Sequence, residues 1–384
     1  MKKTILASTL VAAALAGPTF AETLKIGLAT AQTGGLAGYD GPVIEGVHIA
    51  VDEINAEGGI NGNIKIELVE KDVRSDAAQT AIAVQELADE GVSVIVLPCD
   101  ADPALASIGT VTSAQIPAIS TCASSPTLPM IGGDFMFANF PGDNVQATVS
   151  AEWAREQGHE TAYIIYSPDS QYTTMPLYFS DVFEALGGEV LGQDTHSIGQ
   201  QDFSAIATRI AALDPQPDVI MTSSYEPDFP SMLKALRAAG VTSQMIGSDG
   251  IDSPTTFSLG DVGEGVVFTT AGHATEGNPL AEFNAKYEAA TGSPSETVFN
   301  AVGYDLVIVV AEAVKAAGTT DPIAIRDALA ELENVRGATS LITYKGTNGM
   351  PVREVTLIRV TDGERELVGQ PSPTAELIPA PRMQ

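Results

Sequence analysis

The sequence has 384 residues, of which 44% are hydrophobic, and this is enough to build a large core in more than one domain. Its formal net charge of −30 disfavours nucleic acid and anionic lipid surfaces as partners, because both are negatively charged. The four histidines are scattered and have no partners at metal-ligand spacing, so we expect no metal site.

Residues 1–21 have the pattern of a secretory signal peptide. Lys2 and Lys3 give a charged start, an apolar run follows, and small residues precede a cleavage site after Ala21. The apolar run is too short for a membrane anchor. No cysteine follows the cleavage point, so we expect an exported protein without a lipid anchor.

From Leu24 onward, short apolar runs alternate with amphipathic helical runs. This alternation predicts parallel strands joined by right-handed helical crossovers. The first series predicts strands at 24–30, 64–72, 92–98 and 116–121, with helices at 42–59, 76–91 and 103–115.

A second series of similar size follows the first. It predicts strands at 161–167, 188–197, 217–224 and 243–249, with helices at 147–158, 178–188, 202–213 and 228–240. Two successive series of this kind predict two α/β lobes.

The remaining third of the chain returns to helices. The pattern predicts a strand at 264–271 and helices at 279–291, 298–317 and 321–332. Residues 341–363 then predict two strands around a turn at Asn348-Gly349. The Pro-rich stretch 366–384 is expected to be an extended, partly disordered tail.

The motifs of common enzyme and cofactor sites are missing. The sequence contains no G-x-S-x-G, no P-loop, no G-x-G-x-x-G and no H-E-x-x-H. We therefore expect a protein that is not an enzyme and that needs no cofactor.

Cys99 and Cys122 are the only cysteines, and each follows a strand of the first predicted sheet. In an exported protein they form either a disulfide or two partly buried thiols.

Residues 26–72 contain the segments T-G-x-x-A and D-E-I-N-A-x-G-G-I-N-G. This stretch resembles the opening of the branched-chain amino-acid-type periplasmic binding proteins, the type I solute receptors of ABC importers. Similar segments recur at 170–175, 202–210, 225–240, 246–251 and 357–363.

The resemblance implies an α/β fold of two Rossmann-like lobes with parallel sheets, joined by three hinge crossings near 139–143, 269–273 and 345–350. Lobe one is then 24–140 plus 271–345, lobe two is 141–270 plus 346–365, and the tail is 366–384. The family implies a periplasmic monomer that closes on a small solute and docks on an ABC permease at the inner membrane.

The resemblance also implies the binding residues. Ser124 and the backbone of Cys122 match the groups that hold a ligand carboxylate, and Asp249 matches the acid that holds an ammonium group. Aromatic residues that match the walls of the binding cleft are Tyr39, Tyr172 and Tyr225. Structural alternatives remain: Asp249 as a turn residue, Ser124 as a helix cap and the tyrosines as core residues.

One segment departs from the family pattern. Where amino-acid binders carry serines, this chain has Asp100-Ala101-Asp102. Asp102 precedes Pro103 and is expected to cap a helix. Asp100 matches a position that contacts the ligand carboxylate, and two carboxylates about 4 Å apart repel by roughly 4 kcal/mol at an effective dielectric constant of 20.

Two interpretations of Asp100 follow. Either its side chain points away and the solute is an amino acid, our first choice, or the solute is a cationic amine, polyamine, betaine or amide. The segments expected to form the cleft contain several acids and no lysine or arginine. The same fold could instead serve as a sensory solute receptor.

Overall fold

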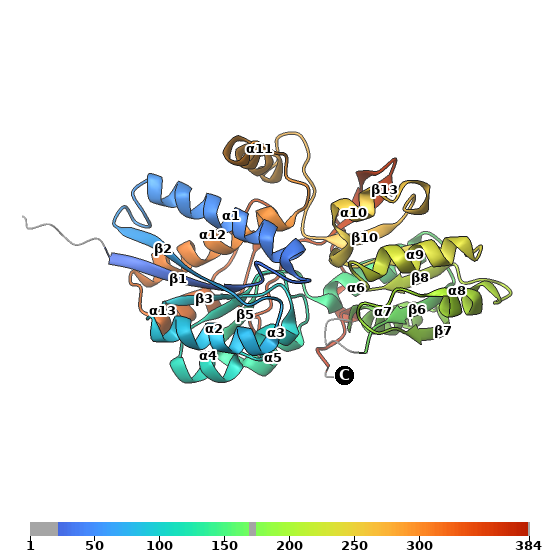
Figure 1. Cartoon of the computed structure of the whole chain (residues 1–384), viewed down its shortest axis with the longest axis horizontal. Helices are drawn as coiled ribbons and strands as arrows, with labels where there is room; N and C mark the ends of the chain where they lie inside the picture. The colour runs from blue at the N-terminus through green and yellow to red at the C-terminus, as the bar shows by residue number, and fades with distance from the viewer. Residues whose placement is uncertain (1–21, 169–173, 383–384) are drawn as a thin grey trace, which may run out of the picture.

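The computed structural model describes residues 22–168 and 174–382, which form two lobes side by side along the long axis (Figure 1). The expected signal peptide lies outside these residues. Within the described chain, every helix is too short or too polar to cross a bilayer.

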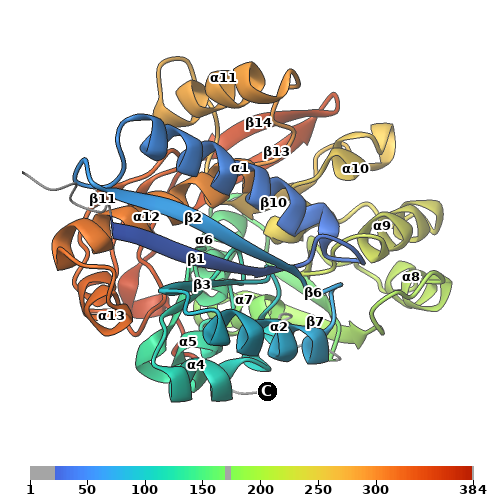
Figure 2. The same cartoon turned by 60° about the vertical axis from the view of Figure 1, so that its left-hand side comes forward.

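Lobe one is built on a parallel sheet with the strand order β2-β1-β3-β4-β5. Its strands are β1 (Glu22–Thr30), β2 (Ile64–Asp72), β3 (Val94–Leu97), β4 (Ala118–Ser120) and β5 (Met136–Ala138). Helices cover both faces (Figure 2). α1 (Ala37–Ala56) and α12 (Phe299–Ala317) pack on one face, and α2 (Ala77–Asp89), α3 (Ala101–Leu105), α4 (Ile108–Ala114) and α5 (Thr127–Gly132) pack on the other.

This layering explains the apolar strands of the sequence. In β3, Val94 and Val96 belong to the core under α1 and α12, whereas Ile95 and Leu97 belong to the opposite core. A strand buried on both faces reads as a continuous apolar run. α11 (Pro279–Thr291) and α13 (Pro322–Ala330) pack beside α12.

Lobe two is built on a sheet with the order β14-β13-β10-β9-β8-β6-β7. Its strands are β6 (Thr161–Tyr166), β7 (Glu189–Thr195), β8 (Val219–Thr222), β9 (Gln244–Gly247), β10 (Val267–Thr270), β13 (Thr356–Thr361) and β14 (Glu364–Gly369). α6 (Asp143–Glu156) and α7 (Thr174–Ala185) cover one face, and α8 (Ser204–Ala211) and α9 (Asp228–Ala238) cover the other. The short α10 (Pro254–Phe257) follows β9.

The predicted α/β fold with two lobes is confirmed, and the differences are local. The helix expected at 103–115 is divided into α3 and α4. The chain does pair across the turn at Asn348-Gly349, but only in one antiparallel bridge between Thr343 and Val352. The strand before the turn, β12 (Leu341–Ile342), pairs with β11 (Val335–Arg336). β13 instead runs antiparallel to both β10 and β14, so the second sheet has an antiparallel edge.

The expected tail begins inside this edge. Residues 366–369 belong to β14, so the sheet of lobe two extends past residue 365. Farther on, Arg382 forms an ion pair with Asp181 at 2.6 Å and its backbone N–H donates to the Tyr178 hydroxyl at 3.0 Å. The tail therefore packs on α7 instead of extending away.

Three connections cross between the lobes: 139–142 after β5, 271–278 after β10 and 343–355 after β12. A buried guanidinium ties two of them to lobe one. Arg353 pairs with Asp305 of α12 at 3.0 Å, both side chains are fully buried, and Arg353 also donates to the carbonyl of Asn139. The first and third crossings are thus fixed to one helix.

Replacing Arg353 with methionine is expected to lower the free energy of unfolding by about 3–5 kcal/mol, because Asp305 would be left buried and unpaired. Chemical denaturation measures this loss. The control is Arg359→Met, which breaks an ion pair with Glu366 whose side chains are 35% and 49% exposed. It is expected to cost at most about 1 kcal/mol. Equal losses in the two variants would contradict the role assigned to Arg353.

Candidate functional site

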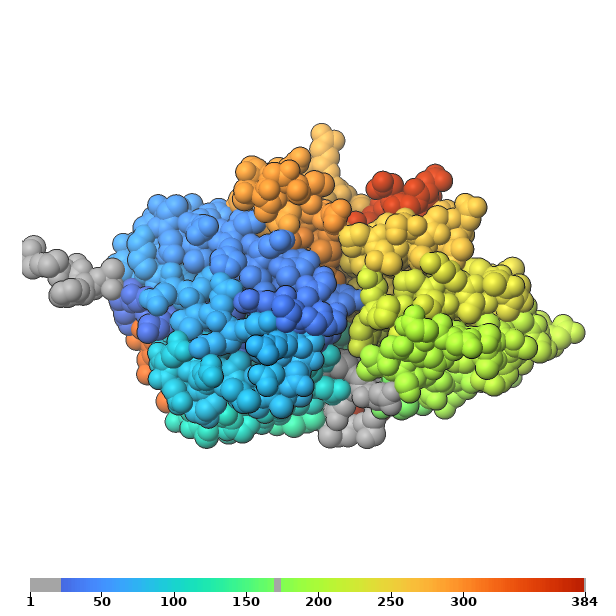
Figure 3. Space-filling model, viewed as in Figure 1, coloured from blue at the N-terminus to red at the C-terminus, as the bar shows by residue number. Residues whose placement is uncertain are grey.

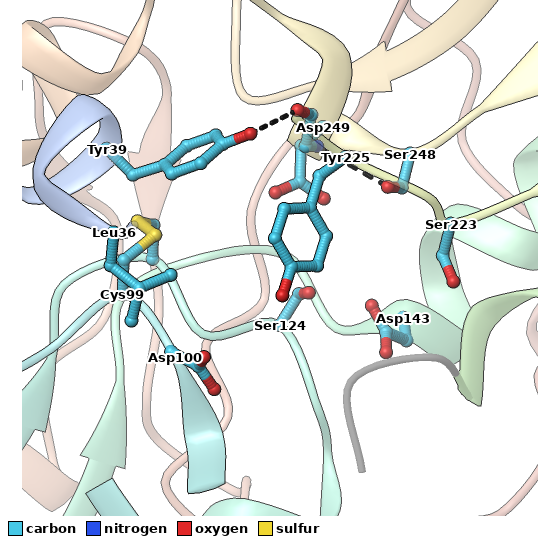
Figure 4. A pocket seen from close by; sticks show the side chains of 12 residues that line it. Leu36, Tyr39, Cys99, Asp100, Ser124, Asp143, Ser223, Tyr225, Ser248 and Asp249 are labelled. Atoms are coloured by element: carbon cyan, nitrogen blue, oxygen red, sulfur yellow. Dashed lines mark hydrogen bonds between the residues drawn. A yellow bond between two sulfur atoms is a disulfide. The ribbon is translucent and has the colours of Figure 1, made fainter. Parts of the chain in front are cut away.

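A cavity of about 70 Å³ lies where the two lobes meet. A bound water occupies about 10–15 Å³ by this measure, so the cavity holds roughly five waters or one small organic molecule. In the space-filling view the two lobes lie against each other near the middle of the molecule (Figure 3). The cavity wall consists of Leu36, Tyr39, Cys99, Asp100, Cys122 and Ser124 from lobe one and Asp143, Ser223, Tyr225, Ser248, Asp249 and Gly250 from lobe two (Figure 4).

The wall is built where strands end. Cys99 follows β3, Cys122 follows β4, Ser223 follows β8 and Ser248 follows β9. The carboxyl ends of parallel strands meet at one edge of a sheet, which is where ligands bind in open α/β folds. Here the binding edges of two sheets face each other.

Asp40 in the first turn of α1 holds the lobe-one edge together. Its fully buried carboxyl accepts hydrogen bonds from Ala31 N at 2.7 Å, Cys99 N at 2.8 Å and the Thr121 hydroxyl at 3.1 Å. These donors follow β1, β3 and β4. Burial raises the pKa of Asp40 to about 7, and the three hydrogen bonds act in the opposite direction.

Cys99 and Cys122 are joined in a disulfide. The bond links the ends of β3 and β4, and both residues belong to the cavity wall (Figure 4). Of the two alternatives that the sequence left open, the structure contains the disulfide.

Asp100 has a structural role that the sequence interpretation gave to Asp102. α3 begins at Ala101, and its N-cap is Asp100, whose Oδ1 accepts from Asp102 N at 3.2 Å. The expectation that Asp102 caps this helix is wrong, because the helix starts two residues earlier than the Asp-Pro pair suggested. Burial and the charge of Asp102 raise the pKa of Asp100 well above its usual range.

Two further carboxyl groups come from lobe two. Asp143, the first residue of α6, is 2% exposed and accepts from the Thr174 hydroxyl at 2.7 Å. Burial raises its pKa to about 6, against the hydrogen bonds from Ser124 and Thr174. Asp249 is 8% exposed, and burial followed by the charge of Asp143 raises its pKa to about 8. Within the described chain, no group of three or more acids, histidines or cysteines is arranged to hold a metal ion.

Tyr39 connects the two sides of the cavity. Its hydroxyl donates to the carbonyl of Gly250 at 2.8 Å and accepts from Glu226 N at 3.3 Å (Figure 4). Its ring meets that of Tyr225 edge to face, with centroids 6.1 Å apart. A lobe-one side chain therefore makes polar and aromatic contacts with lobe two.

The structure brings every predicted site residue except Tyr172 into the cavity wall. Tyr172 lies outside the described residues. Sequence reasoning missed several others: Leu36, Asp143, Ser223, Ser248 and Gly250. The signal for the two serines was available, because each directly follows an apolar strand run of the second lobe.

Comparison with known proteins supports this architecture. The periplasmic binding protein family matches residues 23–365. The Leu/Ile/Val-binding protein BraC3 of Rhizobium johnstonii is 26% identical over 94% of this chain and 97% of its own. A leucine-, isoleucine-, valine-, threonine- and alanine-binding protein of Pseudomonas aeruginosa is 25% identical over 80% of this chain and 82% of its own.

Solved structures agree. The substrate-binding protein LivJ of a Streptococcus pneumoniae branched-chain amino acid transporter, in complex with isoleucine, superposes with a TM-score of 0.81 at 26% identity. The match covers 91% of this chain and all of that one. Members of this family are substrate-binding proteins of ABC importers, so the expectation that the chain is not an enzyme is confirmed. The chain belongs to the periplasmic binding protein family, in its branched-chain amino-acid type.

Proposed function

We propose that the protein binds a small amino compound, with amino acids as the first candidates, in the cavity between its lobes. As a periplasmic monomer it then delivers this solute to an ABC permease at the inner membrane. The observation that carries the proposal is a small cavity whose wall both lobes supply at the carboxyl ends of their strands. Relatives of nearly the same length are named for binding branched-chain amino acids.

Closure of the lobes supplies the mechanism. A solute that touches both lobes favours the closed state, because only that state makes both sets of contacts. The contacts of Tyr39 with Gly250 and Glu226 belong to the closed state. The permease can then distinguish loaded from empty protein by the relative position of the lobes.

The charges of the wall suggest how an amino group is held. The carboxyl of Asp249 is buried beside Asp143, so it offers a strong acceptor to an ammonium group in a site with little screening. The ring of Tyr225 packs against the solute and attracts positive charge. Ser124 of lobe one donates a hydrogen bond to the carboxyl of Asp143 in lobe two, so this pair also connects the two sides of the cavity wall.

Isothermal titration calorimetry with amino acids and small amines tests the proposal, together with small-angle X-ray scattering before and after addition. Micromolar binding accompanied by compaction is expected. Failure of every amino compound to bind would overturn the proposal.

Tyr39→Phe is expected to weaken solute binding by about tenfold, mainly through faster dissociation, because the closed state loses two hydrogen bonds of about 1 kcal/mol each at most. Stopped-flow measurement of the dissociation rate checks this. The matched control is Tyr163→Phe, which removes a hydroxyl bonded to Asp194 at 2.8 Å outside the cavity wall. A control with the same loss of affinity would show that Tyr39 has no special role.

Asp249→Asn is expected to flatten the pH dependence of stability in the solute-free protein. The pKa of Asp249 is raised to about 8 from 3.8, so between these values the native state holds a proton that the unfolded chain has lost. The free energy of unfolding therefore falls by up to about 1.4 kcal/mol per pH unit from this group as pH rises. Asparagine removes this contribution.

Urea denaturation at pH 5, 6, 7 and 8 measures the difference. Asp261→Asn, at an exposed position, is the control and is expected to leave the slope unchanged. If Asp249→Asn also leaves the slope unchanged, the carboxyl is ionised across this range and the assignment of its proton is wrong.

A further inference from the structure

The cavity wall carries three carboxyl groups and no positive charge among its described residues. Asp100 stands on lobe one, and Asp143 and Asp249 stand on lobe two. None of the three forms an ion pair within the described chain, where the ion pairs lie elsewhere. A positively charged group of a bound solute can therefore balance the charge of these carboxyl groups.

The cavity wall also contains a buried hydroxyl group without a hydrogen-bond partner among the described residues. Ser223 is 7% exposed, and its hydroxyl has no hydrogen-bond partner among the described residues. Figure 4 shows its oxygen on the side of the cavity that holds Asp143. A buried hydroxyl without a partner is unfavourable, so a solute N–H or O–H that reaches it gains affinity.

Asp100 discriminates against a second kind of solute group. Its Oδ1 is used by the helix cap, but the carboxyl still borders the cavity. When Asp100 is ionised, a carboxylate about 4 Å from it would lose roughly a thousandfold in affinity at an effective dielectric constant near 20. The burial and the charge of Asp102 that raise the pKa of Asp100 also disfavour a solute carboxylate at this place. A solute N–H group at the same place would bind more tightly, because it can donate a hydrogen bond to the carboxyl of Asp100.

We infer that this cavity selects a small aliphatic ammonium compound whose carboxylate is absent or is blocked as an amide. The inference rests on the proposed function, a small amino compound bound between the lobes, and it places amines and amino-acid amides before the free amino acids named there as first candidates. The ammonium group lies between Asp249 and Asp143, within reach of Ser223. An amide, hydroxyl or second ammonium group then faces Asp100.

Matched pairs of solutes that differ only in the carboxylate test the inference on the mature wild-type protein. The pairs are leucine with leucinamide, leucine with 3-methylbutylamine, lysine with cadaverine, ornithine with putrescine, and glycine betaine with choline. Calorimetry at pH 7.5 gives the dissociation constant of each compound. In every pair that binds, the partner without the carboxylate is expected to bind at least tenfold more tightly.

The outcomes separate the two proposals. If the carboxylate-bearing partner binds more tightly, the inference is overturned while the proposed function stands. Leucine binding that strengthens toward low pH would also overturn it, by showing that a protonated Asp100 holds the carboxylate. If no compound of any pair binds, the proposed function fails and the inference fails with it.

Asp100→Asn and Asp100→Ser assign the selection to this residue, and both replacements keep a side chain that can cap α3. Each is expected to reduce the preference for the carboxylate-free partner at least tenfold. Asp102→Asn is the matched control, because it removes a neighbouring charge from a residue outside the cavity wall. A preference that both Asp100 variants retain in full would overturn the role of Asp100.

Discussion

The buried pair of Arg353 and Asp305 is the constraint on which the two-lobed arrangement depends. A charge pair without solvent exposure needs both partners, since either one alone would be costly to bury. Because Arg353 also binds the carbonyl of Asn139, two crossings leave lobe one from a fixed point. Both crossings are therefore held to α12 at the place where they leave lobe one.

The lobe-one edge is rigid for a related reason. Asp40 binds the backbone or side chains that follow three strands, and the disulfide of Cys99 and Cys122 joins two of those ends again. Asp100 follows Cys99 directly and is fixed in turn by its own cap. The cap thus holds one oxygen of a carboxyl that borders the cavity, and under the proposed selectivity this carboxyl faces the incoming solute.

The sequence predicted much of this structure, because apolar runs of period two or 3.6 report directly on buried strands and helices. It could not predict contacts between distant segments. Arg353 and Asp305 are 48 residues apart, and no local pattern connects them. Asp143 was missed because its place in the wall depends on how the two lobes face each other, whereas Ser223 directly follows an apolar strand run and could have been predicted. The helix cap was assigned to Asp102 instead of Asp100 because the Asp-Pro pair is a strong local signal for a helix start, whereas the true start lies two residues earlier.

Salt screens the negative charges on the protein surface more strongly than the carboxyl groups inside the cavity. A net charge of −30 attracts cations to the protein, but salt screens exposed charges beyond about 8–10 Å, so the surface distinguishes poorly between solutes. Inside the cavity screening is weak, and burial raises the pKa of Asp249 to about 8, so this carboxyl can hold a proton at neutral pH instead of an uncompensated charge. In the proposed mode of binding, an ammonium group that enters replaces this proton as the counter-charge. A solute carboxylate cannot supply that counter-charge, so the proposed selectivity follows from the same acidic groups whose burial and mutual repulsion raise the pKa of Asp249.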